Sequence, residues 1–510
     1  MWRKLSLPTA VLLATMATQA QAALVISPTG PTTNVSCVSH VCTATAANAV
    51  LAVSRVRRLL ASGSVKVATG SAANDIEIDA AFGWTSASTL TLDAQHSIAV
   101  NNPVTVSGPG GLTIITNDGG TGGTLLFAKP GRVNFWSLSS SLTINGNAYT
   151  LVNNIATLAS HIASNPSGFY ALAANYDATP DGVYTTTPIS TEFTGVLKGL
   201  GNTISYLKVH TPRPGGEAAL FYRISGGGAV AGLGLTHVDI RGEQIGGIVA
   251  EFVSGLLFND FVTGALTING NGNGEAGGLA LTNSQDATID RSYSAANVSG
   301  NHSTLGGLVA ASSGPITNSY ATGSVTGGNS ARVGGLVGKA QAMVLSKSYS
   351  TGKVAGGDWV IAGGLVGESG GVGTANIVSD SYATGSVTGG QHASVGGFVG
   401  RNDTGSGTVN SFADSYSTGS IVGGAGSSIG GFVGKDFGTD NFSDCYWDTT
   451  TSGITDLSQG AGNVANDPGI TGLTTAQLQS GLPAGFSASI WGENSGINGG
   501  LPYLLSIPPE

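Results

Sequence analysis

One glycine-rich phrase recurs along this chain at a nearly constant interval. The segment GGLVGESGG…SYATGSVTGG, which begins at Gly363, returns in altered form from about residue 232 onward. Its paired glycines begin 28 to 34 residues apart, at Gly246, Gly277, Gly306, Gly334, Gly363, Gly396 and Gly430. A tyrosine keeps a similar step of 27 to 34 residues, at Tyr293, Tyr320, Tyr349, Tyr382, Tyr416 and Tyr446. Two landmarks that advance together indicate a repeat array.

The repeat unit is too small to form a core of its own. Each unit holds three short strand-like runs, typified by GGLVG, SYATG and SVTGG, with glycine corners between them. Stacked copies can bury the apolar face that one copy leaves open. Parallel strands about 4.8 Å apart would place equivalent residues in columns. The inward column is expected to be Val298, Val325, Val354, Val387 and Ile421. The repeats therefore predict an all-β fold, a parallel β-helix (β-solenoid), and Phe261 reads as an earlier, degenerate copy of the tyrosine landmark.

Composition excludes several other classes of protein. The 510 residues include 81 glycines but only 10% charged residues, without the strict three-residue period of collagen. The 41% hydrophobic content argues against a disordered chain. A net charge of −9 gives no electrostatic reason to expect nucleic acid or an anionic membrane as a partner.

The N-terminus is typical of an exported protein. Arg3 and Lys4 precede the apolar run LPTAVLLATMA, and Ala20-Gln21-Ala22 fits a cleavage site. Residues 1–22 are therefore expected to be a signal peptide, and no transmembrane segment is expected in the mature chain. In an oxidising compartment, the close pair Cys37 and Cys42 is expected to form a disulfide.

Zinc binding is the alternative for these two cysteines together with His40, although no fourth ligand is evident. Cys445 occupies the place of a serine in other repeats and is expected to be a buried wall residue.

We expect four regions in the mature chain. Residues 23–75 would be an N-terminal cap with a helix in AANAVLAVSRVRRLLASG, and residues 76–231 a less regular β-helix. Residues 232–446 hold the regular repeats, and residues 447–510 form a C-terminal capping segment. Further short helices are expected in NNIATLASHIASNPSG and TTAQLQSG. Trp447 and Trp491 are expected to close the C-terminal end of the solenoid.

A column of carboxylates stands out among the candidate site residues. Asp380, Asp414 and Asp444 each lie two residues before a tyrosine landmark, so they are expected to lie one above another and to repel. They would form either a calcium site, the carboxylates of a sugar-cleaving β-helix, or solvated turns whose repulsion is screened.

Trp359 is the candidate ligand contact. It falls in the expanded corner GGDWVIAGG, where an indole can stack on a sugar ring or a partner surface, or fold back over the wall. A second column, Thr322, Thr351, Thr384 and Thr418, raises the alternative of an ice- or crystal-binding face, which inward-facing threonines would exclude.

Motifs of common enzymes are missing from the sequence. The seven histidines have no metal-ligand spacing, and there is no phosphate loop or nucleophile elbow in a helix-bearing context. We therefore expect a non-enzymatic protein without a cofactor.

The phrases GGLVG…SYATGSVTGG and CYWDTTTSG…GLTTAQLQ resemble GLUG-repeat proteins over about half the chain. STLTLDAQHSIAV, SLTINGNAYTLV and FTGVLKGLGNTISYLKV look like segments of filamentous-haemagglutinin-type exoproteins. This resemblance implies a right-handed β-helix with short capping helices at a Gram-negative cell surface, commonly an adhesin for host glycans or for extracellular-matrix or cell-surface proteins. Periplasmic residence, a carbohydrate-active β-helix enzyme and a purely structural spacer are the alternatives. No secretion module, autotransporter barrel or His-Glu-x-x-His protease motif accompanies the resemblance.

Overall fold

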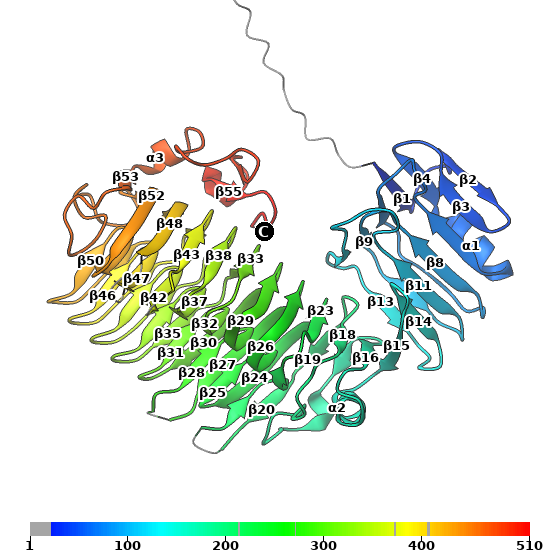
Figure 1. The fold of residues 1–510 in the computed structure, drawn as a ribbon, viewed down its shortest axis with the longest axis horizontal. Helices are drawn as coiled ribbons and strands as arrows, with labels where there is room; N and C mark the ends of the chain where they lie inside the picture. The colour runs from blue at the N-terminus through cyan, green and yellow to red at the C-terminus, as the bar shows by residue number, and fades with distance from the viewer. Residues whose placement is uncertain (1–21, 213–214, 271, 372–373, 405–408, 510) are drawn as a thin grey trace, which may run out of the picture.

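Short parallel strands wind through most of this chain as a β-helix, which confirms the predicted fold class (Figure 1). The computed structural model describes residues 22–509 apart from 213–214, 271, 372–373 and 405–408. The predicted signal peptide lies outside the described residues except for Ala22. Within those residues the α-helices are short: α1 (Val53–Ser62), α2 (Ile155–Ser164) and α3 (Thr475–Leu478).

The glycine pairs stack in register, one coil above another. Each of the seven pairs has its first glycine at the end of a short strand: β25 (Gln244–Gly246), β28 (Glu275–Gly277), β31 (Thr304–Gly306), β36 (Arg332–Gly334), β41 (Ile361–Gly363), β46 (Ser394–Gly396) and β50 (Ser428–Gly430). These strands and β21 (Glu217–Ala218), which ends on an alanine, form one sheet of eight. A Cβ on Gly363 would lie 1.9 Å from the Val366 carbonyl oxygen and 2.4 Å from the Gly400 nitrogen. Backbone from this coil and the next fills the corner, so no side chain fits there.

One coil contains more strands than the sequence pattern indicates. The coil that starts at β36 continues through β37 (Val337–Ala340), β38 (Val344–Ser346), β39 (Tyr349–Ser350) and β40 (Val354–Ala355). The runs before the glycine pair and before the tyrosine are therefore strands as well, because their central residues Val333 and Leu345 point into the core and are fully buried. The predicted inward column is confirmed, since each of its five aliphatic residues is buried and pairs with the next.

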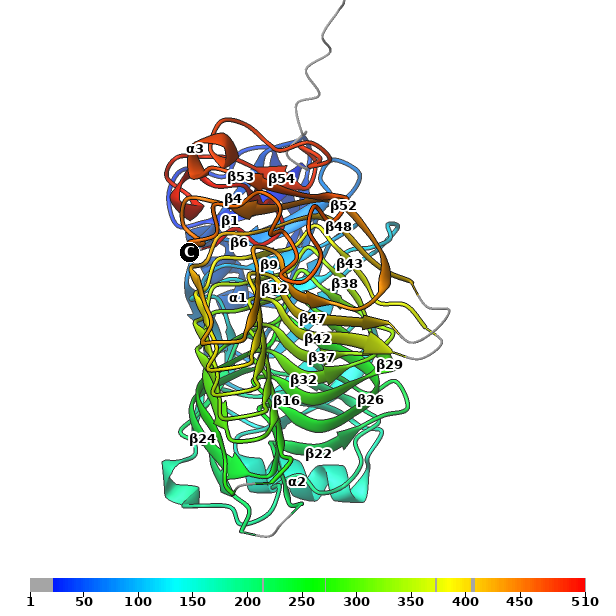
Figure 2. The same cartoon turned by 90° about the vertical axis from the view of Figure 1, so that its left-hand side faces the viewer.

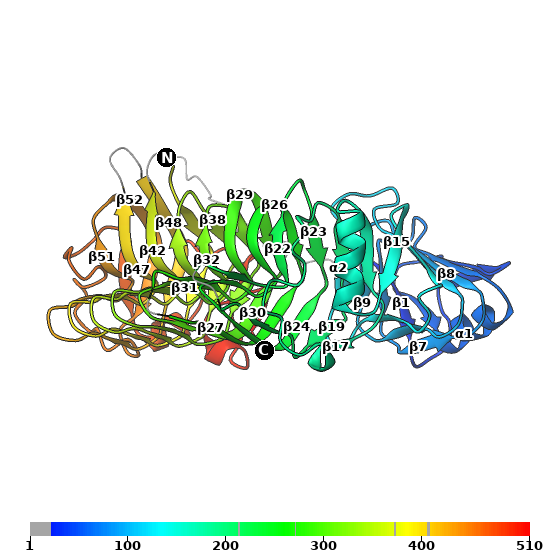
Figure 3. The same ribbon diagram turned by 90° about the horizontal axis from the view of Figure 1, so that it is seen from below.

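A hairpin divides the solenoid into two stacks of coils. β14 (Ser141–Ile144) pairs with β15 (Asn147–Val152) in antiparallel fashion, and β15 then pairs in parallel with β16 (Phe169–Leu172). The two largest apolar clusters among the described residues accordingly meet near this hairpin. Figure 1 shows the body bending there, and Figure 3 shows α2 at the junction. This change of architecture lies within residues 76–231, the region expected to be a less regular β-helix.

The residues expected to form an N-terminal cap already belong to the first stack. One of its sheets runs through β12 (Leu125–Phe127), β9 (Ile98–Val100), β6 (Asp75–Ile78), β1 (Ala23–Ser27) and β4 (Ala49–Ala52). The predicted helix in this region is correct only over its second half. Leu51 pairs with Ile26 in the sheet, so residues 49–52 are a strand and α1 begins at Val53.

The last residues of the chain do not only close the final coil. After β53 (Ile470–Leu473) the chain forms α3 and the antiparallel pair β54 (Trp491–Gly492) and β55 (Tyr503–Leu504), and it turns back across the outside of the repeats (Figure 1). Figure 2 shows α3 and β54 at the same edge of the solenoid as β53. We call residues 474–509 the C-terminal strap. Trp447 lies in the core of the last coils, as expected, whereas Trp491 lies against the tyrosines on the outer face.

Candidate functional site

The tyrosine landmarks form a continuous ladder on the outside of the second stack. Tyr320 stacks on Tyr293 and on Tyr349 with ring centroids 4.7 Å apart and 2° and 5° between the planes. The ladder starts at Phe261, whose ring centroid is 5.0 Å from that of Tyr293. Because neighbouring rings cover each other's faces, only ring edges and hydroxyl groups face outward. The strand pattern explains this orientation, since Ala321, the residue after Tyr320, is buried in the core.

The C-terminal strap covers the end of the ladder at Tyr382 and Tyr416. Trp491 packs with its ring centroid 6.0 Å from Tyr382 and 5.9 Å from Tyr416. The Tyr416 hydroxyl donates to the Pro502 carbonyl oxygen at 2.5 Å and accepts from Asn498 Nδ2 at 2.8 Å. These contacts bury Tyr382 and Tyr416 completely.

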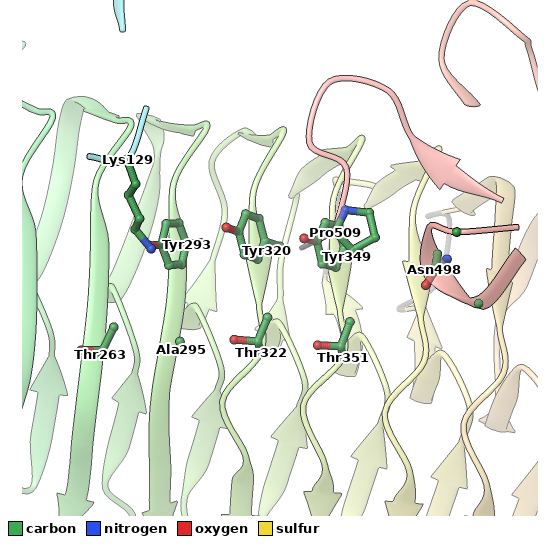
Figure 4. A pocket seen from close by; sticks show the side chains of 12 residues that line it. Lys129, Thr263, Tyr293, Ala295, Tyr320, Thr322, Tyr349, Thr351, Asn498 and Pro509 are labelled. Atoms are coloured by element: carbon green, nitrogen blue, oxygen red, sulfur yellow. The ribbon is translucent and has the colours of Figure 1, made fainter. Parts of the chain in front are cut away.

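The earlier rungs, from Tyr293 to Tyr349, line a groove of about 600 Å³ (Figure 4). We call it the tyrosine groove. Figure 4 shows two parallel rows of side chains along its floor, one of tyrosines and one made mostly of threonines. The strap bounds one end and Lys129 the other. The lining residues are Lys129, Thr263, Tyr293, Ala295, Tyr320, Thr322, Tyr349, Thr351, Gly496, Asn498, Gly499 and Pro509.

Lys129 reaches the ladder from the first stack. Its Nζ lies 5.1 Å from both the Phe261 and the Tyr293 ring centroids. An ammonium equally far from two stacked rings sits at their shared edge and not over a face, so the cation–π contribution is small. Lys129 therefore acts mainly as a positive charge at the end of the groove. Sequence reasoning missed Lys129 and Asn498, because both come from segments outside the repeats.

The predicted carboxylate column lies beside the ladder. Asp380, Asp414 and Asp444 occupy left-handed turns with φ of 46°, 49° and 51°, directly after strand residues that pair in register. Burial, and then the charges of Asp380 and Asp444, raise the pKa of Asp414. The strap packs here too, since Trp491 Nε1 donates to Asp380 Oδ1 at 3.3 Å. The strap rather than an open groove therefore lies against these carboxylates.

Trp359 lies at a corner of the solenoid, away from the tyrosine groove. Its indole stacks on the His392 ring with centroids 4.4 Å apart, and it remains 61% exposed. One face of the indole therefore covers the next coil while the rest of the ring meets solvent, and its contact with a ligand stays a prediction.

The outward threonine column begins exposed and ends covered. Thr322 is exposed, Thr351 and Thr384 are half-buried, and Thr418 is buried. Exposure falls along the column toward the C-terminal end of the solenoid, so the threonines do not form one flat exposed face.

The three cysteines have separate roles. Cys37 and Cys42 are joined by a disulfide across a hairpin of β2 (Val35–Val38) and β3 (Val41–Ala44). Cys445 is a free, buried thiol in the column of small residues, and burial raises its pKa. Among the described residues, no three His, Cys, Asp or Glu side chains gather as a metal site. None of the helices in that same part of the chain has the length and apolar character needed to cross a bilayer.

Comparisons with known proteins give limited matches. No family model matches the chain. It is 30% identical over 245 residues to Halomucin of Haloquadratum walsbyi (strain DSM 16790 / HBSQ001), which is 45% of this chain but only 2% of that protein.

Among solved structures, an IgA1 protease has 20% identity and a TM-score of 0.38, covering 50% of this chain and 20% of that one. A putative immunoglobulin A1 protease from Bacteroides ovatus has 16% identity and a TM-score of 0.36, covering 71% and 93%. Because both TM-scores are low, the fold assignment rests on the coil-to-coil strand pairing itself.

Proposed function

We propose that this chain is a non-enzymatic, adhesin-like binding protein of the cell exterior, which holds an extended ligand in the tyrosine groove. Within this proposal it is a GLUG-repeat protein of the filamentous-haemagglutinin-like type, and its ligand is a host glycan or a matrix or cell-surface protein. The observation that carries the proposal is the groove itself, where two rows of hydroxyl-bearing side chains run along the solenoid and end at a lysine.

The chemistry of the groove suits a polymer better than a small compact ligand. Successive tyrosine rings repeat every 4.7 Å, so a chain with regularly spaced polar groups can bond to one coil after another. The strap supplies an internal example, because a backbone carbonyl oxygen and a side-chain amide bond to the Tyr416 hydroxyl. Each such contact is weak on its own, and display of many copies raises the overall avidity.

The test is a binding screen of purified residues 23–510 against neutral and acidic glycans, matrix proteins and bacterial cells. The double variant Tyr320→Phe, Thr322→Val removes two hydroxyls from the groove and keeps nearly the same shape. We expect it to weaken the saturable binding found in the screen at least tenfold.

Tyr382→Phe is the matched control, since it makes the same chemical change beneath the strap and outside the groove. We expect the control to bind as the unchanged protein does. Equal binding by the double variant, or no binding in the whole screen, would contradict the proposal. Loss of binding with Trp359→Ala alone would move recognition to the corner that carries Trp359.

A further inference from the structure

A second cavity lies at the junction of the two stacks, separate from the tyrosine groove. Its volume is about 440 Å³, within the range typical of small-molecule sites. The first stack contributes polar side chains, among them Thr116, Asn117 and Asn145. The second stack contributes Lys198 and Asp290. We call this cavity the junction pocket.

Lys198 is the unusual member of this lining. It ends β18 (Val196–Lys198) and is half-buried, and its ammonium has no hydrogen bond or ion pair with any residue that the structure describes. Burial lowers its pKa, and the charge of Asp260 opposes that shift. The Asp260 carboxylate already accepts hydrogen bonds from the backbone N–H groups of Leu233 and Phe258, at 2.8 and 3.1 Å. An anion that enters the pocket would stabilise the charged form of a desolvated lysine that has no direct hydrogen-bond partner.

Asp290 lies too far from Lys198 to be that anion. The register runs from Lys198 to Ala231, to Phe258 and then to Asp290, which is three coil steps. At about 4.8 Å a step, the two backbone positions are roughly 14 Å apart. Asp290 Oδ1 is instead held by Thr317 Oγ1 and Asn318 Nδ2, both at 2.8 Å.

The space between Lys198 and Asp290 has mixed chemistry. Thr288 offers a hydroxyl group and Thr317, whose proton goes to Asp290, an acceptor oxygen, while Leu125 and Leu256 add apolar surface. Leu256 is 37% exposed, so this apolar surface is accessible from solvent. A sugar ring has the matching combination of hydroxyl groups around its edge and an apolar face of C–H groups.

We propose that the junction pocket binds an acidic saccharide, with the sugar carboxylate on Lys198 and the hydroxyl groups toward Asp290 and the threonines. The carboxylate forms a charge-assisted hydrogen bond with the lysine ammonium. Asp290, at the other end of the pocket, would repel the sugar carboxylate. The charges at the two ends of the pocket therefore fix the orientation of the bound sugar.

Isothermal titration calorimetry with a hexuronic-acid disaccharide tests the proposal on residues 23–510 at low ionic strength. The probe for charge is the same disaccharide with its carboxyl group reduced to an alcohol. We expect saturable binding of the acidic form, at least tenfold weaker binding of the neutral form, and at least a tenfold loss with Lys198→Met. The exposed Lys353 gives the matched control, Lys353→Met, which is expected to bind normally.

A second measurement needs no substitution. Lysines labelled by reductive methylation with carbon-13 give separate NMR signals, and the Lys198 signal is expected to shift on titration with the acidic disaccharide. Equal affinity for the two disaccharides, an unchanged affinity in Lys198→Met, or a stationary Lys198 signal would each overturn the proposal. Lys198→Met tests the junction pocket and the Tyr320, Thr322 variant tests the tyrosine groove, so the two proposals fail independently.

Discussion

Tyr382 and Tyr416 stack with ring centroids 5.2 Å apart, but only the Tyr416 hydroxyl forms hydrogen bonds with the strap. The Tyr382 hydroxyl is buried without a hydrogen-bond partner among the described residues. Two neighbouring rungs of one ladder therefore differ in polar contacts while their packing is nearly the same.

This pair yields a direct stability prediction. Tyr416→Phe is expected to lower the free energy of unfolding by about 1 kcal/mol, because it breaks bonds to Pro502 and Asn498. Tyr382→Phe removes a buried hydroxyl that has no partner, so it is expected to be neutral or stabilising. Urea denaturation of both variants measures the difference, and equal destabilisation by the two would contradict it.

The glycine corner should not tolerate even a methyl group. Gly363→Ala places a Cβ against backbone atoms of its own coil and the next, and overpacking of this kind typically costs about 1–3 kcal/mol. Gly63→Ala is the control, because the nearest atoms to its Cβ belong to the His40 ring at 3.5 Å or more. Thermal denaturation should show a clearly lower Tm for Gly363→Ala only. A similar Tm for both variants would mean that the coils adjust to fill the corner differently.

Asp260 should make the protein less stable as pH rises. Burial raises its pKa to about 7, although two backbone N–H groups and the Lys198 charge act in the opposite direction. The unfolded carboxyl has a pKa of about 3.9. Its contribution is therefore fully present below about pH 4 and is lost as the pH rises toward 7, by at most about 1.4 kcal/mol per pH unit.

The measurement is the free energy of unfolding at several pH values, for the unchanged protein and for Asp260→Asn. Subtracting the two profiles removes the contribution of the other carboxyl groups. The difference should slope between about pH 4 and 7, and a flat difference would show that Asp260 does not titrate in that window.

Trp491 should hold the strap on the ladder. It packs on Tyr382, Tyr416 and Phe486, and its ring centroid lies 4.5 Å from that of Phe486. Trp491→Ala is expected to cost about 3–5 kcal/mol locally and to open residues 474–509 to proteolysis. Limited proteolysis with mass spectrometry locates the cleavage sites. Trp359→Ala, at a position that is 61% exposed, should leave the digestion pattern unchanged.

The repeating part of the fold could be predicted because its contacts lie one repeat apart. Residues such as Val325 and Val354 meet because equivalent positions in successive coils pair in register, and the spacing of landmarks in the chain reports that pairing. The same regularity revealed the tyrosine column and the aspartates beside it, and it allowed Phe261 to be recognised as the first rung.

Contacts between segments of different character were decided only by the tertiary structure. Asn498 meets Tyr416 across 82 residues, and Asn259 donates to the Phe127 carbonyl oxygen across 132 residues. Asn498 and Phe127 both lie outside the repeats, so the repeat spacing does not predict these contacts. The reversal at β14 and β15 likewise depends on one hairpin. The amino-acid sequence thus determined the periodic β-helix, whereas the folded chain decided which rungs stay open, where the body bends, and that Lys198 lies in a pocket between the two stacks.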